Sequence, residues 1–227
     1  MSEAFFDWDL RSAEARFQRA YEINPNDFNT LSGYIYYLWI VGRFEDCMEL
    51  QRQALLLDPL AFDIGTDMAF TLFNARRYQE SIDQVLSLLP LDPDRWAGHT
   101  ILAGSYSMAG RHEDAVNSAE WLIARGGEDQ QSLAVATWAL GLAGHDQRAR
   151  EISDRLSGLA SDYWVDPVYE AIALGGLGEI GQALDKLEQG YEERSVLMTW
   201  IGVSPFFDPL RDEPRFQELM QRMNFPE

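Results

Sequence analysis

The feature of this chain that most constrains its fold is a pattern of residue types that returns every 34 positions without a gap. A repeat of this length is typical of proteins that stack one small structural unit many times. Three landmarks carry the pattern: a turn residue, a small residue five positions later, and a proline or small residue that ends the unit. In that order they are Gly42, Arg76, Gly110, Gly144 and Gly178; Cys47, Ser81, Ala115, Ala149 and Ala183, with Ala13 one period earlier; and Pro25, Pro59, Pro93, Gly127, Ser161 and Ser195.

Each landmark has a physical role in a helical hairpin. A glycine at the turn can take the left-handed backbone angles that end one helix and let the next begin. A small residue lies where two antiparallel helices approach most closely. A proline ends the second helix because it cannot donate a backbone hydrogen bond. The pattern therefore predicts an all-α fold whose unit is helix, turn, helix and stop. Arg76 replaces one turn glycine and is expected to weaken its unit.

With this period and these residue types, the chain resembles the tetratricopeptide repeat family over nearly its whole length. The resemblance implies a right-handed superhelix of antiparallel helix pairs, closed by a C-terminal capping helix. The chain departs from the family pattern because the usual tryptophan and glycine of the first helix are mostly missing, Ile35 standing at one glycine position. The register predicts a partial unit at 1–25 that is only a second helix, five units at 26–195 and a cap at 196–227.

The cap, the last unit and four tryptophans carry further local expectations. Asp212 is expected to cap a helix that has Pro214 in its first turn and covers the last unit. Phe216, Leu219, Met220 and Met223 form the apolar face of this helix. The pair Gly175-Gly176, near the end of a helix, predicts a loosened turn. Trp96, Trp121, Trp164 and Trp200 are expected to pack between units or under the cap.

A narrower resemblance concerns both ends of the chain. The run SPFFDPLRDEPRF from Ser204 to Phe216 and the opening FFDWDLRSAEARFQRA look like the repeat region of bacterial multidomain signalling proteins. In those proteins a class III adenylate or guanylate cyclase domain, or a winged-helix DNA-binding domain, precedes such a region. The resemblance implies a regulatory or scaffolding part cut from a longer protein. The partial first unit also suggests that the chain was cut from a longer protein. The alternative is a structural repeat protein that self-associates through Phe5, Phe6 and Trp8.

The charge of the chain restricts its partners. It has 37 acidic residues against 18 basic residues, a net charge of -19. Nucleic acids and anionic membranes attract basic surfaces, so we expect neither as a direct partner. The acidity favours a basic partner, or serves solubility alone.

The sequence shows no leader pattern and no apolar run of about 18 residues, which predicts a soluble cytoplasmic protein.

No motif of an enzyme, a cofactor site or a metal site stands out in the sequence. His99, His112 and His145 lie in different units, and the nearby carboxylates occupy turn positions that usually face water. The glycine-rich run 175–178 follows a helix and lacks a Lys-Ser or Lys-Thr pair, so it does not predict a phosphate-binding loop. Cys47 occupies the small-residue position and is expected to be a buried thiol. The sequence therefore predicts no catalytic residue, no metal and no cofactor.

The remaining candidate is the concave face of the superhelix. In this family the first helix of each unit lines the groove, and the register carries its groove positions over as Asn29, Ser32, Tyr36, Trp39, Asp63, Thr66, Phe70, Phe73, Asn74, Thr100, Ser107, Met108, Gln131, Ala134 and Trp138. None is basic, so the groove does not look like that of the carboxylate-clamping co-chaperones. It favours an apolar protein segment with some positive charge, or the chain's own upstream domain. Its aromatic residues could equally pack between units or receive a helix of the same polypeptide.

Overall fold

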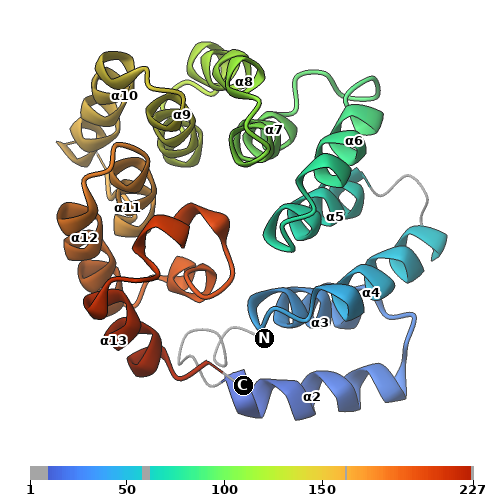
Figure 1. Ribbon diagram of the computed structural model, residues 1–227. Helices are drawn as coiled ribbons and strands as arrows, with labels where there is room; N and C mark the ends of the chain where they lie inside the picture. Colours follow the sequence, from blue (N-terminus) through green and yellow to red (C-terminus); the bar gives the residue numbers. More distant parts are fainter. Residues whose placement is uncertain (1–9, 58–61, 162, 226–227) are drawn as a thin grey trace.

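The computed structural model of the chain describes residues 10–57, 62–161 and 163–225, and every regular element in these ranges is a helix. Figure 1 shows the helices as antiparallel pairs that follow one another around an arc. The prediction of an all-α superhelix of helix pairs is therefore confirmed. Phe5, Phe6 and Trp8, the residues of the predicted self-association surface, lie outside the described residues.

The helices of the arc alternate between its inner and its outer side. Figure 1 shows the odd-numbered helices from α3 to α11 inside the arc and the even-numbered helices outside. Their bounds are α2 Leu10–Ile23, α3 Phe28–Ile40, α4 Phe44–Leu57, α5 Phe62–Asn74, α6 Tyr78–Leu88, α7 Trp96–Met108, α8 His112–Arg125, α9 Gln130–Leu142, α10 Asp146–Gly158, η1 Leu159–Ser161, α11 Pro167–Gly176 and α12 Ile180–Glu192. The inner helices are nearly continuous apolar runs because their neighbours cover them on several sides.

The repeat landmarks have the local geometry that the sequence predicts for them. The five turn positions all have positive φ, +75° at Gly42, +60° at Arg76, +72° at Gly110, +77° at Gly144 and +72° at Gly178. The small residues of the second helices are fully buried, where each outer helix packs against its inner partner. Arg76 takes the left-handed turn although a side chain there costs about 1 kcal/mol.

One glycine pair corrects the sequence prediction. A methyl group on Gly176 would lie 2.3 Å from Trp138 Cα, and one on Gly141 would lie 2.2 Å from the Gly176 carbonyl oxygen. These glycines let the backbones of α9 and α11 touch, and α11 stays helical through Gly176. The predicted loosened turn is wrong because the missing side chains serve close packing and not flexibility.

After α12 the chain forms two short 3-10 helices and a last α-helix: η2 Val196–Trp200, η3 Pro205–Leu210 and α13 Pro214–Met223. The helix α13 packs on α12, where Arg215 forms ion pairs with Asp185 at 2.7 Å and Glu188 at 2.8 Å. This is the predicted capping helix, and Phe216, Leu219 and Met223 are buried as expected. Its N-cap is Glu213 and not Asp212, because Pro214 begins the helix one residue after Glu213.

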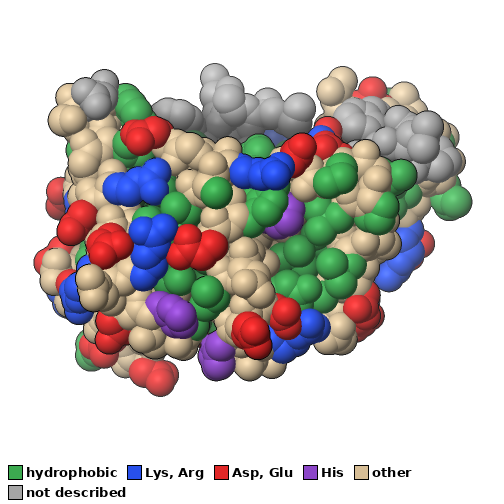
Figure 2. All heavy atoms as spheres, turned by 90° about the horizontal axis from the view of Figure 1, so that it is seen from above, with side chains coloured by type: hydrophobic (Ala, Val, Ile, Leu, Met, Phe, Trp, Pro, Cys, Tyr) green, Lys and Arg blue, Asp and Glu red, His purple; other side chains and the backbone are tan. Residues whose placement is uncertain are grey.

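The outer surface is acidic but densely ion-paired. On the face in Figure 2, basic side chains lie beside acidic ones. Arg148, for example, contacts Glu120 at 3.0 Å and Glu151 at 3.3 Å. Pairs of this exposure contribute little to stability, at most about 1 kcal/mol each, so they mainly neutralise the local charge. Within the described part of the chain, no helix combines the length and the apolar character that a membrane span requires.

Candidate functional site

The inner side of the superhelix holds a segment of the same chain. Figure 1 shows the stretch from η2 to η3, residues 196–211, inside the arc of helices, and we call it the inner segment. The Trp200 ring lies 5.7 Å from the Trp39 ring and 5.8 Å from the Phe70 ring, both of which belong to inner helices. Trp200 thus packs in the predicted groove and not between units or under the cap. In contrast, Trp96 and Trp164, expected to pack between units, are largely exposed.

Phe206 anchors the other end of the inner segment. Its ring lies 4.9 Å from the Trp138 ring and 5.2 Å from the Phe73 ring, so it bridges α9 and α5. Gly104 on α7 makes room for this contact, because a methyl group there would lie 3.1 Å from Phe73 and 3.4 Å from Phe206. Phe206 and its neighbour Phe207 are buried. The inner segment is therefore part of the core.

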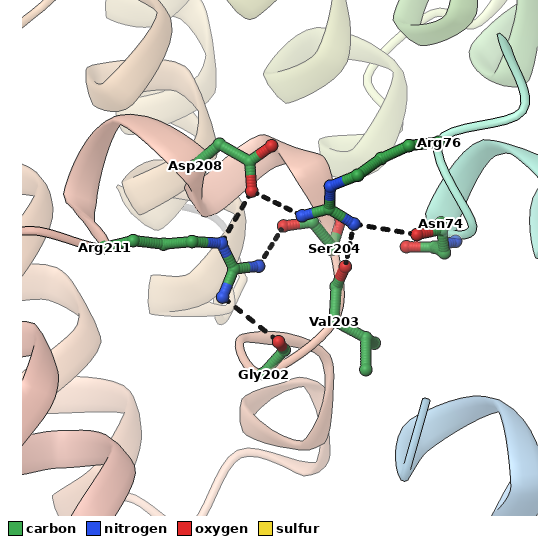
Figure 3. A network of polar contacts seen from close by, with 7 residues as sticks. All are labelled: Asn74, Arg76, Gly202, Val203, Ser204, Asp208 and Arg211. Carbon is green, nitrogen blue, oxygen red and sulfur yellow. Dashed lines mark hydrogen bonds and ion pairs between the residues drawn. The ribbon is translucent and has the colours of Figure 1, made fainter. Parts of the chain in front are cut away.

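An arginine at a repeat turn ties the inner segment to α5, as Figure 3 shows. Arg76 donates to the Asp208 carboxylate at 2.7 Å and to the Val203 carbonyl at 3.2 Å. Arg211 donates to the same Asp208 oxygen at 2.6 Å and to the carbonyls of Gly202 and Ser204. Arg76, expected from the sequence to weaken its unit, thus holds the turn against the inner segment.

The predicted groove residues fall into three groups in the structure. Phe73 and Trp138 are 1% and 0% exposed and contact Phe206. Ser32, Tyr36, Trp39 and Phe70 meet around one open cavity. The others are spread along the inner helices: Asn29 and Asp63 are exposed, Met108 and Gln131 are half-buried, and Thr66, Asn74, Thr100, Ser107 and Ala134 are buried.

The open cavity lies between α3 and α5 beside Trp200 and has a volume of about 320 Å³. We call it the α3–α5 cavity. Four aromatic residues, two isoleucines, one carboxylate and three polar residues line it: Ser32, Ile35, Tyr36, Trp39, Gln51, Ile64, Asp67, Phe70, Thr71 and Trp200. A space of this size holds a side chain or a small ligand, and few polar groups among apolar walls are typical of binding sites.

Three residues that line the α3–α5 cavity carry buried polar atoms without a hydrogen-bond partner in the described part of the chain. These atoms are the indole Nε1 of Trp39, the indole Nε1 of Trp200 and the amide Oε1 of Gln51. An unpaired buried polar atom costs about 1 to 3 kcal/mol, so most such atoms in proteins find a partner. All three atoms lie on residues beside the cavity but have almost no accessible surface in this conformation, so a group bound in the open cavity does not reach them directly.

Among the residues that the structure describes, Asp67 is the only carboxylate that lines the cavity. Partial desolvation there raises the pKa of Asp67 to about 6, although the residue as a whole is exposed. In the same part of the chain its carboxylate has neither an ion pair nor a hydrogen-bond donor. Asp67 is therefore mostly ionised at pH 7 and unpaired in a cavity with aromatic walls.

The raised pKa predicts that Asp67→Asn stabilises the folded chain at neutral pH. The folded-state pKa lies above the ordinary value of 3.8, so ionisation opposes folding, and this loss of stability develops as pH rises from about 4 to about 6. After discounting for solvent exposure, the expected gain at pH 7 is up to about 1 kcal/mol. Urea unfolding at pH 7 and at pH 4 measures it. A gain of the same size at both pH values would contradict the electrostatic cause.

Sequence reasoning missed Asp67, Gln51 and Trp200 as site residues. One signal for Asp67 was present: in the 34-residue register its position is Gly33, Ile101, Val135 and Tyr169 in the other units. A carboxylate at a position that is otherwise uncharged indicates a local role. Gln51 lies on an outer helix, outside the family's groove positions, and Trp200 lies beyond the repeats, so neither carried a periodic signal.

The predicted buried thiol is confirmed, because Cys47 is fully buried and its Sγ donates to the Ile35 carbonyl at 3.5 Å. Burial raises the pKa of Cys47 to about 12, so the thiol is neutral. Within the described residues no group of three or more His, Cys, Asp and Glu side chains could hold a metal ion.

Comparison with known proteins gives the fold. No family model and no curated protein matches the chain. Among solved structures, PilW, a widely conserved type IV pilus biogenesis factor, matches with a TM-score of 0.60 and 17% identity over 88% of this chain and 94% of PilW. A thermophilic tetratricopeptide repeat protein of Thermus thermophilus matches with a TM-score of 0.59 and 14% identity over 83% of this chain and 96% of that protein.

A third match is the APC/C hetero-tetramer Cut9–Hcn1, with a TM-score of 0.64 and 13% identity over 97% of this chain and 47% of the matched chain. Identities this low establish similarity of fold and nothing narrower. Together with the repeat landmarks, the matches show that the chain has the fold of tetratricopeptide repeat proteins.

Proposed function

We propose that this chain is a protein-interaction module that binds a partner segment at the α3–α5 cavity. The observation that carries the proposal is the open cavity on the inner face, whose walls bring together four aromatic residues and the Asp67 carboxylate. Aromatic side chains supply most of the binding energy in protein interfaces, and Tyr36, Phe70 and Trp200 offer such anchors. The fold of the chain, a helical repeat, is widely suited to holding extended or helical segments.

The inner segment narrows the surface that a partner can use. Phe206 covers Phe73 and Trp138, so these two predicted groove positions pack against the chain itself in this conformation. We therefore assign the partner contact to Ser32, Tyr36 and Phe70, with Trp39 behind them. The remaining groove positions stay a prediction that requires the inner segment to move.

Peptide selection tests this function without knowledge of the natural partner. A phage-displayed library of random 12-residue peptides would be selected on the immobilised chain, and enriched peptides would be measured by titration calorimetry. We expect Tyr36→Ala to weaken their binding about 10- to 100-fold, as for an aromatic anchor. Trp164→Ala, an exposed tryptophan outside the cavity, serves as the control and should bind like the original chain. Peptides that bind the Tyr36→Ala chain equally well would contradict the proposal.

For the wider context we propose the regulatory or scaffolding region of a larger bacterial signalling protein. Its support is the resemblance of the run from Ser204 to Phe216 to regions that follow nucleotide cyclase or winged-helix domains. The partner segment could then come from the protein's own upstream domain, in the cytoplasm. Translation of the locus upstream of Met1 tests this. An upstream domain with the paired metal-binding aspartates of a cyclase would support it, and an upstream winged helix would make the protein a transcription regulator. A stop codon immediately upstream would contradict it.

A further inference from the structure

Among the described residues, the carboxylate of Asp67 is the only charged group that lines the α3–α5 cavity. Most described basic side chains form ion pairs with nearby carboxylates. Arg95, for example, pairs with Asp63, which lies one helical turn before Asp67 on α5. Asp67 has no such partner among the described residues, and no basic residue lines the α3–α5 cavity. An unpaired carboxylate in a cavity attracts a cation from outside the fold.

The hydrogen bonds behind the cavity fix a second acceptor there. The Thr71 hydroxyl donates to the Asp67 backbone carbonyl at 2.9 Å, so its oxygen can only accept. Gln51 therefore turns its Nε2 toward Thr71, at 3.0 Å, and keeps its Oε1 on the other side of the amide. This Oε1 has no partner in the described part of the chain, and Gln51 is 1% exposed. This Oε1 is sealed behind the cavity wall in this conformation, so Asp67 carries the acceptor that a bound group reaches directly.

Aromatic rings form the walls around these acceptors. Trp39 stacks on Tyr36 at 5.9 Å and on Phe70 at 5.2 Å, and Trp200 meets the Trp39 ring at 89°. The face of an aromatic ring attracts a cation, so walls of this kind suit a cationic group.

We propose that the α3–α5 cavity is a recognition site for a lysine or arginine side chain of the partner segment. The cation lies against the aromatic walls and donates N–H groups to the Asp67 carboxylate. This inference rests on the proposed function and adds the chemistry of the partner. The excess of 37 acidic over 18 basic residues supports it through long-range attraction of a basic segment.

The pH dependence of binding follows from the groups that face Asp67. On the residues of α3, α4 and η2 that line the cavity, Tyr36 is the only other titratable group, and Gln51 and Trp200 are uncharged. Cys47, behind the cavity, has its pKa raised to about 12 and stays neutral. Because the pKa of Asp67 is raised to about 6, binding of a cation should weaken as pH falls from 7 to 5.

The experiment follows the indole N–H signals of Trp39 and Trp200 by NMR in the intact chain, assigned through Trp39→Phe and Trp200→Phe. The probes are three capped Leu-X-Leu tripeptides, in which X is lysine, trimethyllysine or norleucine, and free n-butylammonium. We expect the lysine peptide to shift both signals, the norleucine peptide to bind at least 10-fold more weakly, and trimethyllysine to bind more weakly than lysine because it donates no N–H. Butylammonium should bind more weakly than the lysine peptide because it lacks the rest of the segment.

Two matched variants locate the charge. Asp67→Asn should weaken the lysine peptide at least 10-fold, whereas Asp83→Asn, on the outer helix α6 and outside the cavity, should leave its affinity unchanged. Equal binding of lysine and norleucine peptides, or no effect of Asp67→Asn, would overturn the inference. Equal affinity for butylammonium and the lysine peptide would overturn the assignment to a protein segment. If selected library peptides bind through Tyr36 yet contain no basic residue, only this inference fails and the proposed function stands.

Discussion

Replacing Phe206 by alanine is expected to lower the free energy of unfolding by about 3 to 5 kcal/mol. Phe206 is 3% exposed, and its ring fills the space between Trp138 on α9 and Phe73 on α5. Its removal leaves a cavity bounded by rings and by the backbone at Gly104, which cannot collapse easily. Urea unfolding followed by far-UV circular dichroism measures the change.

Phe225→Ala is the matched control for this variant. Phe225 is a phenylalanine near the end of the described chain and is only partly buried, so its removal should cost much less. If Phe206→Ala and Phe225→Ala lose the same small amount of stability, the inner segment contributes little to the core. The interpretation of the groove as filled by the chain itself would then be wrong.

The second large effect is expected for Gly176→Ala. The added methyl group would lie 2.3 Å from Trp138 Cα and 2.9 Å from the Trp138 carbonyl oxygen, and backbone atoms cannot turn aside as a flexible side chain can. The helices α9 and α11 must separate, with a loss of about 3 kcal/mol or more. Thermal unfolding measures this as a lower midpoint.

The neighbouring glycine provides the control for the second variant. At Gly175 an added methyl group meets nothing closer than the Phe206 carbonyl oxygen at 3.8 Å. Because alanine favours a helix over glycine, Gly175→Ala should be neutral or stabilising by about 0.5 to 1 kcal/mol. Both variants change a glycine of α11 to alanine. Equal changes in the unfolding midpoint would therefore exclude the close contact between α9 and α11 as the cause of the loss at Gly176.

The repeat architecture could be predicted because its requirements are local. A turn that ends a helix demands positive φ, and a close helix contact demands a small side chain, whatever lies elsewhere in the chain. The prediction held even at Arg76, whose φ is +60°. The function of the small residues at Gly141 and Gly176 could not be predicted, because it depends on the contact between α9 and α11 and not on the helix that contains each glycine.

The candidate site could be predicted only in part. The register found Ser32, Tyr36, Trp39 and Phe70 because they occupy repeated positions on inner helices. It could not place Trp200, since the inner segment lies outside the repeats and its contacts join distant residues. The Tyr36 hydroxyl and Thr199 Oγ1, for example, lie 3.3 Å apart across a separation of 163 residues. No periodic pattern records where such a segment folds back.

The central claim is that residues 196–211 occupy the inner face and leave the α3–α5 cavity as its open part. Nuclear Overhauser effects between selectively labelled aromatic rings test it most directly in the free, intact chain. Trp200 should show contacts to Trp39 and Phe70, whose ring centroids lie 5.7 and 5.8 Å away, and Phe206 should show contacts to Trp138. Absence of these contacts, with Trp200 signals typical of a solvated indole, would show an open groove and contradict the account.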